Sequence, residues 1–278
     1  GDLVAETLLD DAVRRILRAK LCFRLDTNPP VVDPGAVESP AHLAVALDVA
    51  RESIVLLKNA GGTLPLDRMG VGSVVVVGPV ANLANIGDHG SSNVSPTAVV
   101  TALAGIADRA GGGVTVTYVP GPALSPAEQA TIAAAGAVVV VAGLTSNDEG
   151  ESLVTIGDRV SLAMPGSQDG MIAAVAAQNP RTVVVLEGSG PILMPWVNDV
   201  PAILTAWYPG EQGGLAIGDV LFGDVVPSGK LPLSFPVAEA DLPPFDNVSL
   251  AVTYGYYHGY RYLDHNGTMP LFPFGFGL

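Results

Sequence analysis

One acidic segment, residues 145–168, carries the side chains best suited to chemistry in this sequence. Glu149 and Glu151 flank a glycine in it, and the segment follows the very apolar run 137–142. A strand that ends in a carboxylate-rich loop is a common place for the site of an α/β protein. Two nearby carboxyl groups can divide acid and base roles, one as a proton donor and one ionised. The same composition also fits a solvated acidic turn without a catalytic role.

Other motifs in the chain give little support for a different chemistry. The Asp158–Arg159 pair is interpreted as an ion pair that anchors the acidic segment rather than as a catalytic group. No G-x-G-x-x-G follows a strand, no complete phosphate loop is present, and no serine sits in G-x-S-x-G. The four histidines show no metal-ligand spacing, so neither a metal nor a cofactor is expected. Carboxylate chemistry remains as the leading hypothesis.

Short apolar runs alternate with amphipathic runs from about residue 40 onward. This alternation predicts a doubly wound, mostly parallel α/β sheet with helices on both faces, because parallel strands are joined by helical crossovers. The expected strands are 54–57, 73–77, 114–119, 137–142, 182–186 and 202–206, and the expected helices lie near 2–20, 40–51, 97–110, 125–135, 167–178, 190–198 and 212–222. Beyond residue 229 the chain is rich in Pro, Gly and aromatic residues and is predicted to form long packed loops.

Ligands of such sheets bind beyond the carboxyl ends of the strands. Four loops are expected at that edge, at residues 78–92, 143–165, 187–190 and 207–212. They would gather a group of polar side chains, namely His89, Glu149, Glu151, Glu187, Tyr208 and Glu211. The predicted topology therefore nominates one site by geometry alone.

Composition narrows the possible partners. The net charge of −14, with only 13 Lys and Arg residues, makes a nucleic-acid partner unexpected. Although 49% of the residues are hydrophobic, no apolar run approaches the roughly 18–20 residues of a membrane-spanning helix. The single Cys22 excludes an internal disulfide. The chain opens without a signal peptide or an initiating methionine, which suggests a processed or excised piece and leaves the compartment open.

Three runs of the sequence are distinctive: ARESIVLLKN at 50–59, YPGEQGG through VLFGD and PSGKLP at 208–232, and YYHGYRY with PLFPFGFGL at 256–278. Together they resemble glycoside hydrolase family 3, the β-glucosidase-type enzymes. The resemblance implies the second domain of that family, an (α/β)6 sandwich with a six-stranded sheet. It divides the chain into a helix at 1–22 like the end of a preceding (β/α)8 barrel, a linker at 23–40, the sandwich at 41–236, and a C-terminal segment at 237–278.

The same resemblance implies part of a retaining exo-β-glycosidase, with a β-glucoside as the expected substrate. It assigns the general acid/base to Glu149, in a Glu-Gly step, with Glu151 as the alternative. The nucleophile, an aspartate on the barrel, has no counterpart in this chain. Asp88 and His89 occupy the place where many members carry an aromatic residue, and they are expected to contact the substrate. A non-catalytic carbohydrate-binding or scaffold domain of the same fold is the alternative function.

Overall fold

The computed structural model describes residues 4–87, 90, 93–149, 159–246 and 249–278, and these divide into two compact units, residues 1–42 and 43–278. In the first unit, helix α1 (Glu6–Cys22) has an acidic first turn and a basic last turn, which suits the helix dipole. No residue of α1 is buried. Its exposed apolar side chains are Leu8, Leu9, Val13, Ile16, Leu17 and Leu21.

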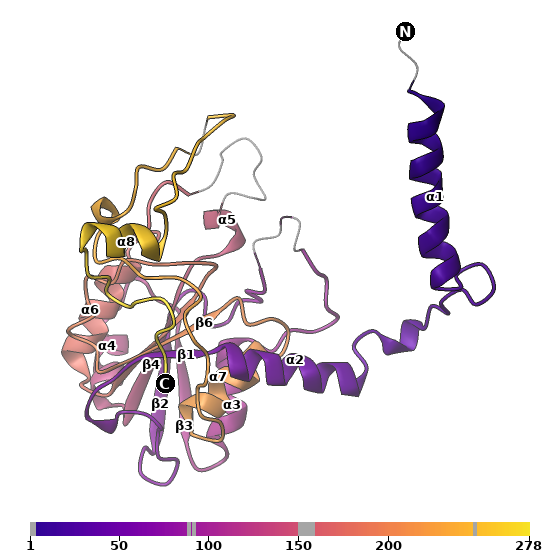
Figure 1. Cartoon of the computed structure of the whole chain (residues 1–278). Coiled ribbons are helices and arrows are strands. Elements are labelled where there is room, and N and C mark those ends of the chain that lie inside the picture. Colours follow the sequence, from indigo (N-terminus) through magenta and orange to yellow (C-terminus); the bar gives the residue numbers. More distant parts are fainter. Residues whose placement is uncertain (1–3, 88–89, 91–92, 150–158, 247–248) are drawn as a thin grey trace. The chain divides into compact units, whose positions relative to one another are not determined.

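The second unit is built on one six-stranded sheet with the order β1-β6-β5-β4-β2-β3 (Figure 1). Its strands are β1 (Val55–Asn59), β2 (Ser73–Val77), β3 (Thr115–Val119), β4 (Ala137–Gly143), β5 (Thr182–Glu187) and β6 (Ala202–Trp207). Only the β1–β6 pair is antiparallel among these strands. Every residue of β4 is buried, as expected for a central strand covered on both faces. The predicted fold class is confirmed.

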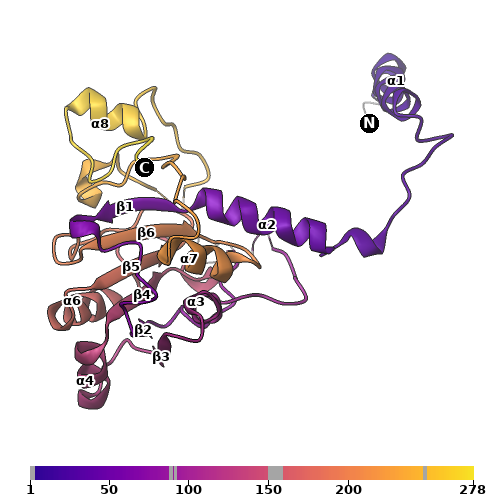
Figure 2. The same cartoon turned by 90° about the horizontal axis from the view of Figure 1, so that it is seen from below.

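Helices cover both faces of the sheet (Figure 2). On one face lie α2 (Pro40–Ser53), α3 (Ala102–Ala110) and α7 (Gly213–Leu221), which share a buried core with alternate residues of the strands. On the other face lie α4 (Pro126–Ala134) and α6 (Gln168–Gln178), together with apolar residues of the C-terminal segment. Successive side chains along each strand point to opposite faces of the sheet, and so they enter the two cores alternately.

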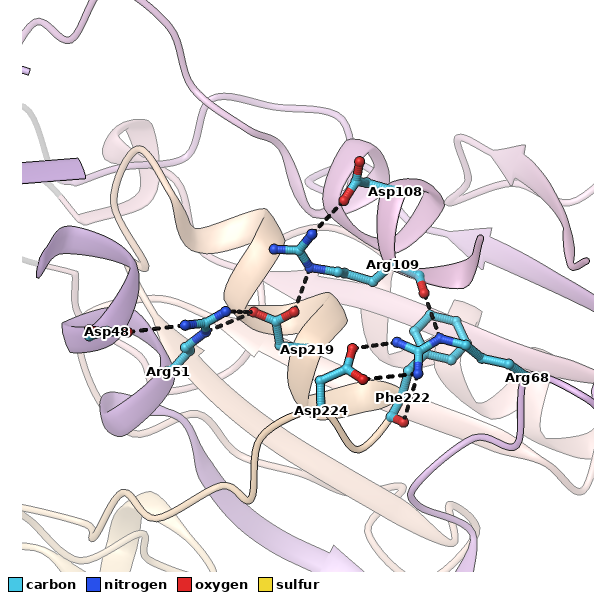
Figure 3. Close-up of polar contacts among 8 residues, drawn as sticks. All are labelled: Asp48, Arg51, Arg68, Asp108, Arg109, Asp219, Phe222 and Asp224. Atoms are coloured by element: carbon cyan, nitrogen blue, oxygen red, sulfur yellow. Dashed lines mark hydrogen bonds and ion pairs between the residues drawn. The ribbon is translucent and has the colours of Figure 1, made fainter. Parts of the chain in front are cut away.

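A network of arginines and carboxylates connects the helices of the first face (Figure 3). Asp219 of α7 is only 2% exposed and accepts hydrogen bonds from Arg51 of α2, at 2.8 Å, and from Arg109 of α3. A carboxylate this deeply buried requires such partners, because an isolated charge in a core is strongly unfavourable. Nearby, Arg68 makes a two-pronged contact with Asp224.

Three local predictions were wrong. Residues 190–198 form turns instead of a helix, with Val197 and Asp199 each bonded to the carbonyl three residues earlier. Two prolines there lack the N–H that a helix needs, and the indole of Trp196 is buried and donates to Asp169 of α6 at 2.7 Å. The helix predicted from residue 97 begins at 102, where Thr101 caps it. The C-terminal segment contains a helix, α8 (Tyr260–Asn266), that was expected to be loop.

Candidate functional site

Glu149 is the last residue of the short helix α5 (Ser146–Glu149), and its side chain is only 9% exposed. Its Oε1 atom accepts hydrogen bonds from the hydroxyl of Tyr208, at 2.9 Å, and from the amide of Ser189, at 3.1 Å. The Nε atom of Arg159 lies 3.9 Å from its Oε2 atom. Two hydrogen-bond donors and one guanidinium group, from three different loops at the carboxyl edge of the sheet, therefore surround this carboxylate.

The backbone after β4 is fixed before it reaches Glu149. Gln168 exchanges two hydrogen bonds with Gly143, from the Gly143 amide at 2.9 Å and to the Gly143 carbonyl at 2.8 Å. Asp148 then accepts from the amide and the hydroxyl of Thr145, at 2.8 and 2.7 Å, and so caps the turn that becomes α5. Hydrogen bonds therefore hold both the end of β4 and the turn that leads to Glu149.

A bulge at the end of β6 precedes Tyr208. The pairing with β5 skips one residue, so that Leu186 faces Thr205 whereas Glu187 faces Trp207. Trp207 has φ = 60°, a conformation that is costly for a bulky side chain. Such bulges turn a strand locally and redirect the side chains that follow. This distortion lies directly before the residue whose hydroxyl contacts Glu149.

Arg159 connects the acidic segment to the loop after β5. Its Nη2 atom donates to the carbonyl of Pro191 at 2.8 Å, while Nη1 is buried without a hydrogen-bond partner among the described residues. Burial lowers the pKa of Arg159, and the nearby Glu149 carboxylate opposes that effect. Asp158, its predicted partner, lies outside the described residues, so the ion pair between them stays a prediction.

A cavity of about 1010 Å³ opens beside these groups. Glu149, Arg159 and Ser189 lie on its wall, together with residues of the C-terminal segment. Those residues include Glu239, Leu242, Pro243, Pro244, Phe245, Tyr254 and His258. Glu239 accepts a hydrogen bond from the Ser161 hydroxyl at 2.6 Å, and this contact lowers the pKa of the Glu239 carboxyl. The cavity is therefore lined by charged groups as well as by apolar and aromatic side chains of the C-terminal segment.

A second carboxyl group lies deeper at the same edge. Glu187, the last residue of β5, is 3% exposed, and its Oε2 atom accepts from the side-chain amide of Asn85 at 3.0 Å. The same amide nitrogen also donates to the carbonyl of Leu144 at 2.9 Å. Burial raises the pKa of Glu187 to about 8, and the hydrogen bond from Asn85 only partly offsets this shift.

The structure brings together some of the residues predicted at the sheet edge. Glu149, Tyr208 and the loop after Glu187 meet, as the four-loop argument expects. Asp88, His89 and Glu151 lie outside the described residues. The contributions of Asn85, Ser189, Glu239, Tyr254 and His258 were missed, because no spacing in the sequence links them to the acidic segment.

Clusters of metal ligands and membrane-spanning helices are both absent from the described residues. Within them, no cluster of three or more His, Cys, Asp or Glu side chains has a geometry that could hold a metal ion. Within the same ranges, every helix is too short or too polar to cross a membrane.

Known proteins resemble this chain along most of its length. The Acetivibrio thermocellus thermostable β-glucosidase B is 34% identical to it over 290 residues, covering 99% of the chain. A Bifidobacterium longum exo-α-(1→6)-L-arabinopyranosidase is 35% identical over 269 residues, covering 89% of the chain. The crystal structure of a Bifidobacterium adolescentis family 3 β-glucosidase matches 89% of the chain with 33% identity and a TM-score of 0.75.

These proteins are much longer than the present chain, which spans 37%, 35% and 37% of their respective lengths. The model of the glycosyl hydrolase family 3 C-terminal domain matches residues 54–278. That match includes the whole sheet and every described residue of the candidate site. The chain therefore belongs to glycosyl hydrolase family 3, and it corresponds to the C-terminal domain of that family.

Proposed function

We propose that this chain is part of a retaining exo-β-glycosidase with a β-glucoside as substrate, and that it supplies the general acid/base, Glu149. The observation that carries the proposal is the position of the Glu149 carboxylate on the wall of the large cavity at the carboxyl edge of the sheet. The names of the β-glucosidase relatives support the reaction class. The nucleophile is proposed to be an aspartate on a barrel domain of the intact protein.

A retaining glycosidase uses two carboxyl groups about 5–5.5 Å apart. One forms a covalent bond to the sugar, and the other first donates a proton to the leaving oxygen and then removes a proton from water. The Tyr208 hydroxyl and the Ser189 amide donate to Glu149. They can therefore stabilise the carboxylate that remains after proton donation, which is also the form that acts as the base in the second step.

The same three contacts, two hydrogen bonds and one ion pair, give Glu149 a second interpretation, as an anchor that ties the acidic segment to the neighbouring loops. In that case Glu151, two residues further along and outside the described residues, is the acid/base. Asp88 and His89 keep their proposed role in contacting the substrate. That the sugar of the substrate is glucose is a separate proposal, since one relative is named an arabinopyranosidase.

The test compares Glu149→Gln and Glu151→Gln in the intact protein that carries this chain. We expect Glu149→Gln to lower kcat/KM on an alkyl β-glucoside at least about 100-fold, whereas kcat/KM on a 2,4-dinitrophenyl β-glucoside should fall much less, since that leaving group needs no proton. Added azide should accelerate the variant and yield a glucosyl azide. Glu52→Gln, an exposed carboxylate on α2, is the matched control.

If Glu151→Gln shows this leaving-group dependence and Glu149→Gln does not, Glu151 is the acid/base and Glu149 the anchor. If neither variant shows it, the catalytic proposal fails. The alternative, a non-catalytic carbohydrate-binding domain, is favoured by the aromatic wall of the cavity, which contains Phe245 and Tyr254. Calorimetric titration with glucose and cellobiose, in wild type and Tyr254→Ala, measures that activity directly.

A further inference from the structure

The buried carboxyl of Glu187 has no role in the proposed reaction, yet it lies beneath the loops that hold the site. The side-chain nitrogen of Asn85 donates to Glu187 Oε2 at 3.0 Å and to the Leu144 carbonyl at 2.9 Å. Both Asn85 and Glu187 are less than 10% exposed. The three residues belong to the loop after β2, the loop after β4 and the end of β5. One amide group therefore ties together three neighbouring strand ends.

Backbone contacts continue this link toward the candidate site. The amide of Leu144 donates to the Glu187 carbonyl at 2.8 Å, so Leu144 and Glu187 are joined twice, directly and through Asn85. Five residues after Leu144 the chain reaches Glu149, and two residues after Glu187 it reaches Ser189. Those two residues are themselves hydrogen-bonded at 3.1 Å. The link at Asn85 and the contact at Glu149 thus close a small ring of chain segments.

We propose that Glu187 is a positioning residue, which through Asn85 fixes the loops after β2, β4 and β5 relative to one another and so sets where the acidic segment presents its acid/base. This inference rests on the proposed function, but it holds whether the acid/base is Glu149 or Glu151, because both follow Leu144 on the same segment. Displacements of about 1 Å can cost roughly 100-fold in rate when they misplace a reacting group.

Substitutions of Glu187 should differ in whether they keep an acceptor for the Asn85 side chain. With its pKa raised to about 8, Glu187 is protonated at neutral pH and resembles a glutamine in shape and charge. Glu187→Gln therefore keeps an oxygen that can accept from Asn85. Glu187→Leu has a similar volume but removes the acceptor and leaves one N–H of the buried Asn85 amide without a partner, so some loss of stability is expected.

The experiment uses the intact protein with Glu187→Leu, Glu187→Gln and Asn85→Leu, assayed on an alkyl and on a 2,4-dinitrophenyl β-glucoside. We expect Glu187→Leu and Asn85→Leu to lower kcat/KM on the alkyl glucoside by roughly tenfold or more, with a smaller loss of kcat/KM on the dinitrophenyl glucoside. Glu187→Gln should retain most of the wild-type kcat/KM on both substrates. Val184→Ala, in the core of the same strand, controls for loss of packing.

Equal losses on both substrates in Glu187→Leu, or a Glu187→Gln variant as slow as Glu187→Leu, would overturn the positioning role and leave a structural one. If Glu187→Leu does not fold, Asn85→Leu and Glu187→Gln still give the decisive comparison, because each changes the link from one side. Failure of the proposed function looks different, since neither Glu149→Gln nor Glu151→Gln would then depend on the leaving group.

Discussion

The hydroxyl of Tyr208 donates a 2.9 Å hydrogen bond to Oε1 of Glu149, although the two residues are 59 positions apart. Tyr208 follows the distorted end of β6, and Glu149 ends the short helix after β4. The contact therefore spans the end of β5, which lies between these two strands in the sheet. It joins the acidic segment to the loop after β6. From the sequence, these two loops are expected only to lie at the same edge of the sheet.

Loss of this hydroxyl should impair activity more than stability. We expect Tyr208→Phe to lower kcat/KM on an alkyl β-glucoside about 10- to 100-fold, since a hydrogen bond to a charged group contributes about 1.5–3 kcal/mol. Tyr118→Phe, which removes a hydroxyl on β3 that donates to the Gly78 carbonyl, is the control and should leave kcat/KM unchanged. Equal activity of both variants would mean that the Tyr208 contact does not assist the reaction.

The raised pKa of Glu187 should make stability depend on pH. The carboxyl ionises near its ordinary 4.5 in the unfolded chain and near 8 in the folded protein. Between these values the folded state binds an extra proton, so this residue's contribution to the free energy of unfolding falls as pH rises, up to about 1.4 kcal/mol per pH unit.

Relative to Glu187→Gln, wild type should therefore lose stability from about pH 4.5 to pH 8 and lose no more above that. Urea unfolding of both proteins across pH 4–9 measures the difference. The exposed substitution Glu52→Gln should give no comparable pH-dependent difference. A gap between wild type and Glu187→Gln that stays constant with pH would contradict the raised pKa.

The two aspartates of the arginine network should differ sharply in their importance. Asp219→Asn leaves Arg51 and Arg109, whose side chains are 25% and 27% exposed, without their shared buried counter-charge, and we expect a loss of about 2–4 kcal/mol. Asp224→Asn removes a pair that is 43% exposed on the aspartate side, and the loss should be about 1 kcal/mol or less. Urea unfolding at low and high salt measures both changes in the free energy of unfolding. Similar losses for the two variants would show that burial does not decide how much these ion pairs stabilise the protein.

The close packing of α3 on α7 depends on glycine. A Cβ atom at Gly105 would overlap the carbonyl group of Gly214, which is backbone and cannot swing aside. We expect Gly105→Ala to destabilise the protein by about 1–3 kcal/mol or more, because the two helices would have to separate. Gly112→Ala adds the same methyl group where nothing lies within 4 Å, and its effect should stay within about 0.5 kcal/mol. Thermal unfolding of the two variants checks this difference.

Periodicity was sufficient to predict most of the sheet and its helices. The runs 73–77, 137–142 and 182–186 recur as β2, β4 and β5 with their bounds changed by at most one residue. Such runs are readable because a strand buried on both faces must be apolar throughout. The turns at 190–198 were misread as a helix because the burial of Trp196 and its bond to Asp169 depend on a distant element, α6.

For the candidate site, the sequence by itself determined that carboxylates follow a buried strand and that several loops share the edge of the sheet. Only the tertiary structure decided which side chains meet there. The contact of Glu149 with Tyr208 depends on a bulge in β6, and that of Asn85 with Glu187 joins residues 102 positions apart. Local patterns encode elements and exposed faces, whereas such contacts arise from strand order, register and packing, which are set by the whole chain at once.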